Sequence, residues 1–246
     1  MNFLGLKNMN ISIVGYGKMG MEIERIAMNR GINVQSIIDP NAQNATHKDI
    51  NERSMQGVNV CIDFTRPDAV LENIKKISHF GKNIVVGTTG WYGNLDEARN
   101  IVNNNGTGLV YAPNFSIGVN IFFRIIESAA RLIDKFPDYD IFGFEMHHSK
   151  KLDSPSGTAK LIEQILVKNI SRKKSVPFAS VRAGSIPGTH VVGFDSNADT
   201  IELKHTARNR EGFALGAIMA AEWIKDKKGF YEINDMMNEI IGGKNA

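Results

Sequence analysis

Hydrophobic and polar positions in the first half of the chain follow two alternating patterns. Short runs rich in β-branched residues predict buried strands, and between them apolar residues recur at helical spacing. The expected strands are 11–14, 34–38, 58–64, 83–86 and 108–111, and the expected helices lie between Met21 and Gly31, at 69–80 and at 95–104. Strands that alternate with helices predict an α/β fold with a Rossmann-like, doubly wound parallel sheet.

The pattern changes after residue 116. A long helix is expected over 120–136, followed by a strand over 139–147, a helix over 158–168 and β-like segments at 181–184, 190–194 and 200–205. We therefore predict an α+β domain for substrate binding and oligomerisation at 117–210, inserted into a dinucleotide-binding domain made of 1–116 and 211–246. The apolar helix at 214–224 is expected to rejoin this first domain.

Composition narrows the possible partners and the compartment. The 246 residues are 42% hydrophobic and 22% charged, with a net charge of +3 and one cysteine. The sequence has no basic element with interleaved aromatic residues, the pattern that would indicate nucleic-acid binding. No window reaches the ~18 apolar residues of a membrane span. Residues 1–8 look like a dispensable leader without signal-peptide features. We expect a cytoplasmic protein without nucleic-acid or membrane partners.

A glycine motif follows the first predicted strand. Gly15-Tyr16-Gly17-Lys18-Met19-Gly20 matches the dinucleotide-binding pattern, and it is followed about twenty residues later by Asp39 at a strand end. A glycine turn without a ligand is the alternative, and the placement of Asp39 argues against it. An acidic residue there binds ribose hydroxyls, which favours NADH over NADPH. Lys18 could still reach a 2′-phosphate, so use of both nucleotides stays open.

Two further loops lie at the carboxyl ends of predicted strands, where ligands bind in open α/β sheets. These are Gly87-Thr88-Thr89-Gly90 and Ala112-Pro113-Asn114-Phe115-Ser116. Each is either a loop beside the nicotinamide or an ordinary strand-to-helix turn, and we take residues 87–89 and 112–115 as candidate cofactor contacts.

Candidate chemistry is concentrated between Glu145 and Lys160. Period-two alternation places Glu145 and His147 on one face of a strand and His148 on the other, which argues against a simple two-histidine metal site. We therefore predict no metal.

The next segment, Ser156-Gly157-Thr158, precedes an apolar stripe at helical spacing. It predicts a helix N-terminus whose free N–H groups can hold a carboxylate. Ordinary N-capping and a solvated lysine pair at 150–151 are the alternatives. The combination of acid–base groups, cations and an anion-binding turn favours a site for an acidic substrate.

These residues carry a family resemblance. Glu145-Met146-His147-His148, followed by Lys151, Asp153 and Pro155-Ser156-Gly157-Thr158-Ala159, resembles the signature of the dihydrodipicolinate reductase (4-hydroxy-tetrahydrodipicolinate reductase) family. The resemblance extends over the glycine motif, 62–65, 87–90, 112–116, 182–188, His205 and the closing helix.

The resemblance implies NAD(P)H-dependent reduction of 4-hydroxy-tetrahydrodipicolinate to tetrahydrodipicolinate, in diaminopimelate and lysine biosynthesis. It implies that His147 is the general acid and Lys151 a second proton-transfer or cationic group. It also implies that His148, Gly157 and Thr158 hold a substrate carboxylate, and that Gly87, Thr89, Ala112 and Phe115 line the nicotinamide. The family is typically homotetrameric through its second domain.

Two departures from the family pattern stand out. The basic neighbour that often follows the strand-end acid is absent, since Pro40 follows Asp39, and this puts NADPH preference in doubt. Ser149-Lys150 replaces an Arg-His pair of some members, a change that we expect to be tolerated.

Two alternatives come from other functional classes. A semialdehyde dehydrogenase would need an exposed catalytic cysteine, whereas Cys61 lies in an apolar run and is expected to be a buried structural thiol. A non-catalytic NAD(H) sensor or scaffold would not need His147 and Lys151 beside a carboxylate-binding turn, although a decayed enzyme could retain them. NADH binding without turnover would favour the sensor.

Overall fold

The structure, a computed structural model, describes residues 9–242; the expected leader at residues 1–8 lies outside this range. The chain divides into two compact units. Unit 1 joins Met1–Ser116 to Arg210–Ala246, and unit 2 is the continuous segment Ile117–Asn209. None of the helices formed by residues 9–242 combines the length and apolar character needed to cross a membrane.

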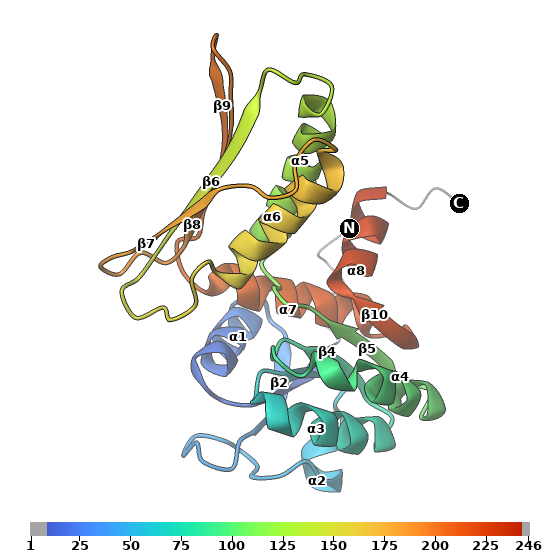
Figure 1. Cartoon of the computed structure of the whole chain (residues 1–246). Helices are drawn as coiled ribbons and strands as arrows, with labels where there is room; N and C mark the ends of the chain where they lie inside the picture. Colours follow the sequence, from blue (N-terminus) through green and yellow to red (C-terminus); the bar gives the residue numbers. More distant parts are fainter. Residues whose placement is uncertain (1–8, 243–246) are drawn as a thin grey trace. The chain divides into compact units, whose positions relative to one another are not determined.

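Within the described residues, unit 1 is built on a six-stranded sheet in the order β10-β5-β4-β3-β1-β2 (Figure 1). The strands are β1 Asn10–Val14, β2 Asn33–Ile38, β3 Val60–Asp63, β4 Asn83–Val86, β5 Gly108–Tyr111 and β10 Gly229–Glu232. All neighbouring strands are parallel. Because β1 lies between β2 and β3, the strand order reverses there, and ligands bind at the carboxyl end of such a point. The Rossmann-like prediction is confirmed.

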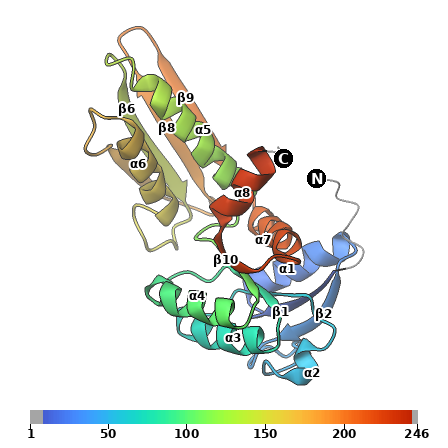
Figure 2. The same cartoon turned by 90° about the vertical axis from the view of Figure 1, so that its right-hand side faces the viewer.

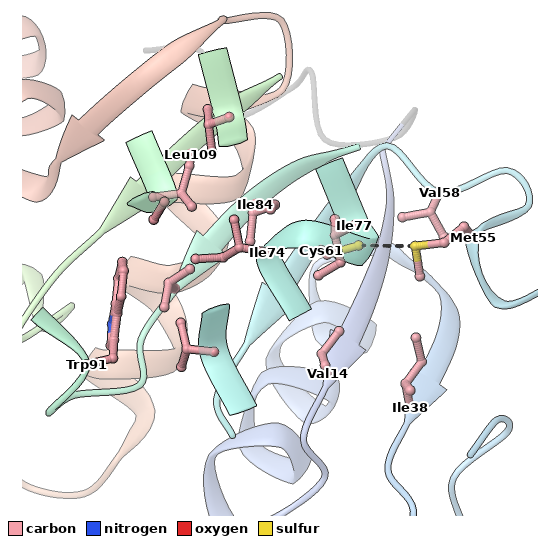
Figure 3. Close-up of a cluster of buried hydrophobic side chains, with 14 residues drawn as sticks. Val14, Ile38, Met55, Val58, Cys61, Ile74, Ile77, Ile84, Trp91 and Leu109 are labelled. Carbon is pink, nitrogen blue, oxygen red and sulfur yellow. Dashed lines mark hydrogen bonds between the residues drawn. The ribbon is translucent and has the colours of Figure 1, made fainter. Parts of the chain in front are cut away.

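Helices cover both faces of this sheet. Their bounds are α1 Lys18–Asn29, α2 Glu52–Met55, α3 Pro67–His79, α4 Leu95–Asn104, α7 Glu211–Ile224 and α8 Ile233–Gly242, with a short 3-10 helix η2 at Tyr92–Asn94. α1 packs with α7 on one face, and α3 packs with α4 on the other (Figure 2). Figure 3 shows the core under α3, where Ile74 and Ile77 meet Ile84 of β4.

A buried amide joins the two chain segments of unit 1. Asn83 Nδ2, at the start of β4, donates to the carbonyls of Ile224, Lys225 and Lys227, at distances from 2.7 to 3.0 Å. Its Oδ1 accepts the N–H of Gly108 at 2.7 Å. One side chain therefore fixes the end of α7 against the amino ends of β4 and β5.

Unit 2, which the structure describes in full, has a four-stranded sheet in the order β7-β6-β8-β9. The strands are β6 Asp140–His147, β7 Phe178–Arg182, β8 Thr189–Asp195 and β9 Thr200–Thr206. β7 runs parallel to β6, and the other pairs are antiparallel. The helices α5 Ile117–Ile133 and α6 Gly157–Asn169 lie side by side on one face of the sheet, over an apolar core (Figures 1 and 2). The predicted α+β arrangement is confirmed.

Several element boundaries differ from those expected. α5 runs over 117–133 rather than 120–136, because Pro137 disfavours helical geometry at Phe136 and the chain turns there, with the Phe136 N–H donating to the Ile133 carbonyl. β7 begins at Phe178, three residues before the predicted start. The sequence pattern did not predict α2, β10 or α8.

Candidate active site

The glycines after β1 have separate structural tasks. Gly15 has a φ of +89°, and a Cβ there would lie 2.4 Å from the Phe64 carbonyl oxygen, so a side chain does not fit. A Cβ at Gly20 would lie 2.3 Å from the Gly15 carbonyl oxygen, so Gly20 allows helix and strand to pack closely. At Gly17, the N-cap of α1, a Cβ would meet nothing within 4 Å. The turn is therefore closed on its inner side and open where a ligand would approach the helix N-terminus.

Asp39 is held to this turn by hydrogen bonds. Its Oδ2 accepts the Tyr16 N–H at 2.8 Å, and its Oδ1 accepts the N–H groups of Asn41 and Ala42 at 2.8 and 2.9 Å. Burial alone would raise the pKa of Asp39, but these donors and Lys48 lower it below its ordinary value. The carboxylate is therefore a fixed negative charge beside the glycine turn.

A cavity of about 440 Å³ opens beside this carboxylate. Its lining includes Gly15, Gly17 and Asp39, together with three cationic side chains that the sequence analysis did not single out: Lys48, Arg66 and Lys76. Lys18 is exposed at the start of α1, and Met19 is half-buried. The cavity has the size of a small-ligand site.

The loop after β4 is organised by a buried acid that the sequence analysis missed. Asp63, at the end of β3, accepts hydrogen bonds from Thr65, Asn73 and Thr88, the last at 3.0 Å. Burial raises the pKa of Asp63 despite these donors. The Thr88 side chain is therefore structural, whereas Thr89 is exposed.

Aromatic packing places the remaining predicted loop residues. A Cβ on Gly87 would lie 2.0 Å from the Phe64 ring, and Phe64 in turn packs on Phe115 with ring centroids 6.3 Å apart. Ala112 and Phe115 are buried, Pro113 is exposed, and Asn114 Oδ1 accepts the Ser116 N–H. Residues 87–89 and 112–115 thus follow two adjacent strands, β4 and β5, at one end of the sheet.

In unit 2, the predicted alternation along β6 is confirmed. Ile141, Gly143, Glu145 and His147 are buried, and the residues between them are half-buried. The neighbouring strand adds His190, which pairs directly with Glu145 in the register of β6 and β8. His147 Nδ1 and His190 Nε2 lie 3.4 and 3.3 Å from Glu145 Oε2. A carboxylate and two imidazoles therefore share one buried site.

The other oxygen of Glu145 is fully engaged. Oε1 accepts hydrogen bonds from Arg182 Nη2 at 2.7 Å, Ser180 Oγ at 2.8 Å and the Ser156 N–H at 2.9 Å. Burial alone would raise the pKa of this carboxyl, but the donors outweigh burial and hold the pKa at about 2. Glu145 is therefore ionised at neutral pH.

For the two imidazoles, burial outweighs the opposing charge and lowers the pKa. It lowers the pKa of His190 to about 4, with the neighbouring His147 adding to the effect. It also lowers the pKa of His147, against the opposing charge of Glu145.

Lys151 and the start of α6 complete the site. Lys151 Nζ lies 2.7 Å from Asp153 Oδ1, and Ser156 Oγ accepts the Ala159 N–H as the N-cap of α6. Gly157 and Thr158 are the first two residues of this helix, and the Gly157 N–H donates to the Asp153 carboxylate. His148 lies just beyond β6 and is half-buried.

Glu145, His147 and His190 also have the donor atoms of a metal site. Their ligand atoms lie within 4.8 Å of one another, and carboxylate and imidazole donors suit zinc. The Arg182 guanidinium, however, already binds this carboxylate, and its charge opposes a second cation. The absence of a metal stays a prediction.

Sequence reasoning missed Arg182 and His190 as members of this site. Neither has a local motif: Arg182 arrives by the parallel pairing of β7 with β6, and His190 by the antiparallel pairing of β8. Glu145 had a signal, since it shares a strand face with His147 two residues away.

Cys61 is a buried structural thiol, as predicted. It is fully buried in β3, and its Sγ–H donates to Met55 Sδ at 3.6 Å (Figure 3). Burial raises the pKa of this thiol to about 12, so it does not supply a thiolate nucleophile. Cys61 therefore does not fit the exposed catalytic cysteine that a semialdehyde dehydrogenase would need.

A parallel sheet with a glycine turn, together with a second unit bearing acid–base groups, defines a two-unit NAD(P)-dependent oxidoreductase. Comparison with known proteins is more specific. The profile for "Dihydrodipicolinate reductase, N-terminus" matches residues 9–115, and that for the C-terminus matches residues 118–237. The chain belongs to the dihydrodipicolinate reductase family.

Individual relatives agree. The chain is 39% identical over 243 residues to the 4-hydroxy-tetrahydrodipicolinate reductase of Christiangramia forsetii, covering 95% of this chain and 99% of that one. It is 31% identical to the Ralstonia pickettii enzyme of the same name, covering 93% and 99%. The dipicolinate-bound dihydrodipicolinate reductase from Paenisporosarcina sp. TG-14 has the same fold, with a TM-score of 0.77, 24% identity, and 93% and 99% of the chains covered.

Proposed function

We propose that the two units divide the work of this reductase, with unit 1 binding the nicotinamide nucleotide and unit 2 binding and protonating the substrate. The reaction is the reduction of 4-hydroxy-tetrahydrodipicolinate in diaminopimelate and lysine biosynthesis, as in the rest of the family. The observation that carries the assignment of the acid is the buried His147, 3.4 Å from an ionised carboxylate.

The nucleotide roles rest on the glycine turn and Asp39. The pyrophosphate binds the open backbone at Gly17 and the N–H groups at the start of α1. Asp39 accepts a ribose hydroxyl through Oδ2, since this oxygen has a second lone pair beyond the one used by the Tyr16 N–H, whereas Oδ1 already accepts two backbone N–H groups. Its negative charge disfavours a 2′-phosphate, which supports NADH as the preferred nucleotide. The loops at 87–89 and 112–115 line the nicotinamide.

The substrate roles rest on the cations and the helix start in unit 2. The start of α6, at Gly157 and Thr158, binds one carboxylate of the substrate, with His148 beside it. Lys151 supplies positive charge for the anionic ligand. The solved relative with dipicolinate bound supports a planar heterocyclic dicarboxylate as the class of ligand.

The chemistry adds one hydride and one proton. A reduced nicotinamide nucleotide held by unit 1 would supply the hydride for an electron-poor carbon of the conjugated imine in the dehydrated heterocycle. His147 donates the proton that balances the electron pair gained by the substrate, and it returns to the neutral imidazole. Lys151 is the second proton-transfer or cationic group, and its positive charge stabilises the anionic ligand. General acid catalysis of this kind contributes about 10²- to 10⁴-fold in rate.

The test is a coupled assay in which pyruvate and aspartate semialdehyde generate the substrate in situ. His147→Gln is expected to lower kcat by about 10²- to 10⁴-fold, with NADH binding unchanged because the nucleotide site belongs to unit 1. His79→Gln, an exposed histidine at the end of α3, is the matched control and should retain full activity. NADH binding without turnover in the wild type would instead support a sensor.

We further propose that the protein is a cytoplasmic homotetramer assembled through unit 2, by analogy with the family. Light scattering coupled to size exclusion should give four times the chain mass. A monomer mass would remove this proposal and leave the catalytic one intact.

A further inference from the structure

Glu145 is a highly connected side chain of unit 2 that the function above leaves without a role. It is fully buried, and its Oε1 is bound by groups from β7 and from the start of α6. Arg182 extends this network, since its Nη2 also donates to the Asp153 carbonyl at 2.6 Å. Glu145 therefore links the strand of the acid to the segment that binds the substrate.

The second oxygen lies next to two imidazoles, those of His147 and His190. Glu145 Oε2 and His147 Nδ1 are both buried, and among residues 9–242 neither has a hydrogen-bond partner. Their separation of 3.4 Å is longer than a charge-assisted hydrogen bond, and catalytic hydrogen bonds commonly shorten when a ligand binds. Because a carboxylate only accepts, the stable arrangement places a proton on His147 Nδ1.

The opposite side of the ring faces the loop before β8. A Cβ on Gly188 would lie 3.1 Å from His147 Nε2, so this nitrogen is directed away from Glu145 and toward that loop. With Nδ1 committed to the carboxylate, Nε2 is the nitrogen free to release a proton.

We propose that Glu145 is a positioning residue: it holds His147 with the proton on Nδ1 and thereby makes Nε2 the proton-donating atom. Through the Ser156 N–H, it also ties this ring to the carboxylate-binding start of α6. The inference rests on the proposed role of His147 as the acid.

Charge gives Glu145 a second effect on the acid. The groups that face His147 are Glu145 on its own strand, Lys151 and Asp153 in the following loop, Arg182 on β7 and His190 on β8. Burial lowers the His147 pKa, Lys151 and Arg182 lower it further, and Glu145 is the main opposing charge. Removing that charge lowers the pKa, so the protonated acid would persist only to a lower pH.

The test compares Glu145→Gln with Ser180→Ala. The glutamine keeps the shape and loses the charge, whereas the alanine removes one hydrogen bond to Oε1 and touches neither imidazole. Glu145→Gln should lower kcat by roughly 10- to 100-fold and move the alkaline loss of kcat to lower pH. Ser180→Ala should change kcat by less than about threefold and leave the pH profile in place.

A direct measurement needs no variant. Nitrogen-15 NMR of the wild-type enzyme should show neutral His147 with its proton on Nδ1, and Glu145→Gln should shift that tautomer equilibrium. A proton on Nε2 in the wild type, or an unchanged kcat and pH profile in folded Glu145→Gln, would overturn the proposal. Unchanged activity in His147→Gln would instead overturn the role of His147 itself, so the two failures are distinguishable.

Discussion

Glu145 and His190 occupy directly paired positions on β6 and β8, with Oε2 and Nε2 3.3 Å apart inside the fold. The pair combines an acid whose pKa is lowered to about 2 with a base whose pKa is lowered to about 4. At neutral pH the carboxylate is therefore charged and the imidazole is neutral. Hydrogen bonds from three donors stabilise the Glu145 carboxylate, and burial disfavours protonation of His190.

This pair predicts a loss of stability in mild acid. An unfolded histidine binds a proton near pH 6.5, whereas folded His190 does so only near its pKa of about 4. As the pH falls below about 6.5, protons favour the unfolded chain, and the free energy of unfolding should drop by about 1–2 kcal/mol between pH 7 and pH 5. Below about pH 4.5, protonation of unfolded glutamate adds a further loss through Glu145.

Urea denaturation at several pH values measures this effect. His190→Gln should flatten the slope between pH 7 and pH 5, and the exposed-site control His79→Gln should retain it. An equal slope in wild type and His190→Gln would show that other groups carry the pH dependence.

Asp39 is predicted to set the nucleotide preference. Asp39→Asn removes the charge that opposes a 2′-phosphate, so the ratio of kcat/KM for NADH over NADPH should fall by roughly tenfold. The ratio is the informative quantity, because damage to the loop that Asp39 organises would affect both nucleotides alike. Lys18→Ala is the counterpart and should weaken NADPH use more than NADH use. An unchanged ratio in Asp39→Asn would assign the preference to other groups in the cavity, such as Lys48 or Arg66.

Two alanine substitutions in one motif should separate folding from binding. Gly17→Ala meets open space at a φ of −82°, so unfolding should be nearly unchanged, while the added methyl blocks the pyrophosphate and weakens NADH binding by roughly tenfold or more. Gly20→Ala places a Cβ against the Gly15 carbonyl and should destabilise unit 1 by about 1–3 kcal/mol. Thermal unfolding measures the effect on stability, and NADH titration measures the effect on binding. Equal loss of stability in both variants would contradict the separate tasks of these glycines.

Chelation is predicted to leave the reaction intact. Neither hydride transfer from the nucleotide nor proton transfer from His147 needs a metal. Dialysis against EDTA should therefore preserve kcat, and elemental analysis of the purified enzyme should find less than one metal per chain. Activity that disappears with EDTA and returns with zinc would contradict this prediction and would indicate that Glu145, His147 and His190 bind a metal.

The sequence was most informative where structure depends on near neighbours. The glycine turn, Asp39 at the end of β2 and the alternation that buries Glu145 and His147 follow from local spacing. The partners of Glu145 do not, because the register of β6 with β7 and β8 brings Arg182 and His190 from 37 and 45 residues away along the chain. Asp63 escaped notice for a similar reason, since two of its partners, Asn73 in α3 and Thr88 after β4, lie 10 and 25 residues away along the chain. The predicted end of α5 was wrong because the helical spacing of apolar residues continues to Phe136, whereas the helix ends at Ile133, ahead of Pro137.

The return of the chain to unit 1 has a consequence for biosynthesis. α7 packs on β3, β4 and β5, and Asn83 fixes its end, yet α7 is made only after the whole of unit 2. While the ribosome synthesises residues 117–209, the first five strands of the sheet have a face that α7 does not yet cover. A nascent chain arrested before residue 211 therefore presents apolar surface to chaperones, although unit 2 is complete in sequence and free to fold. The part of the protein that begins first is finished last.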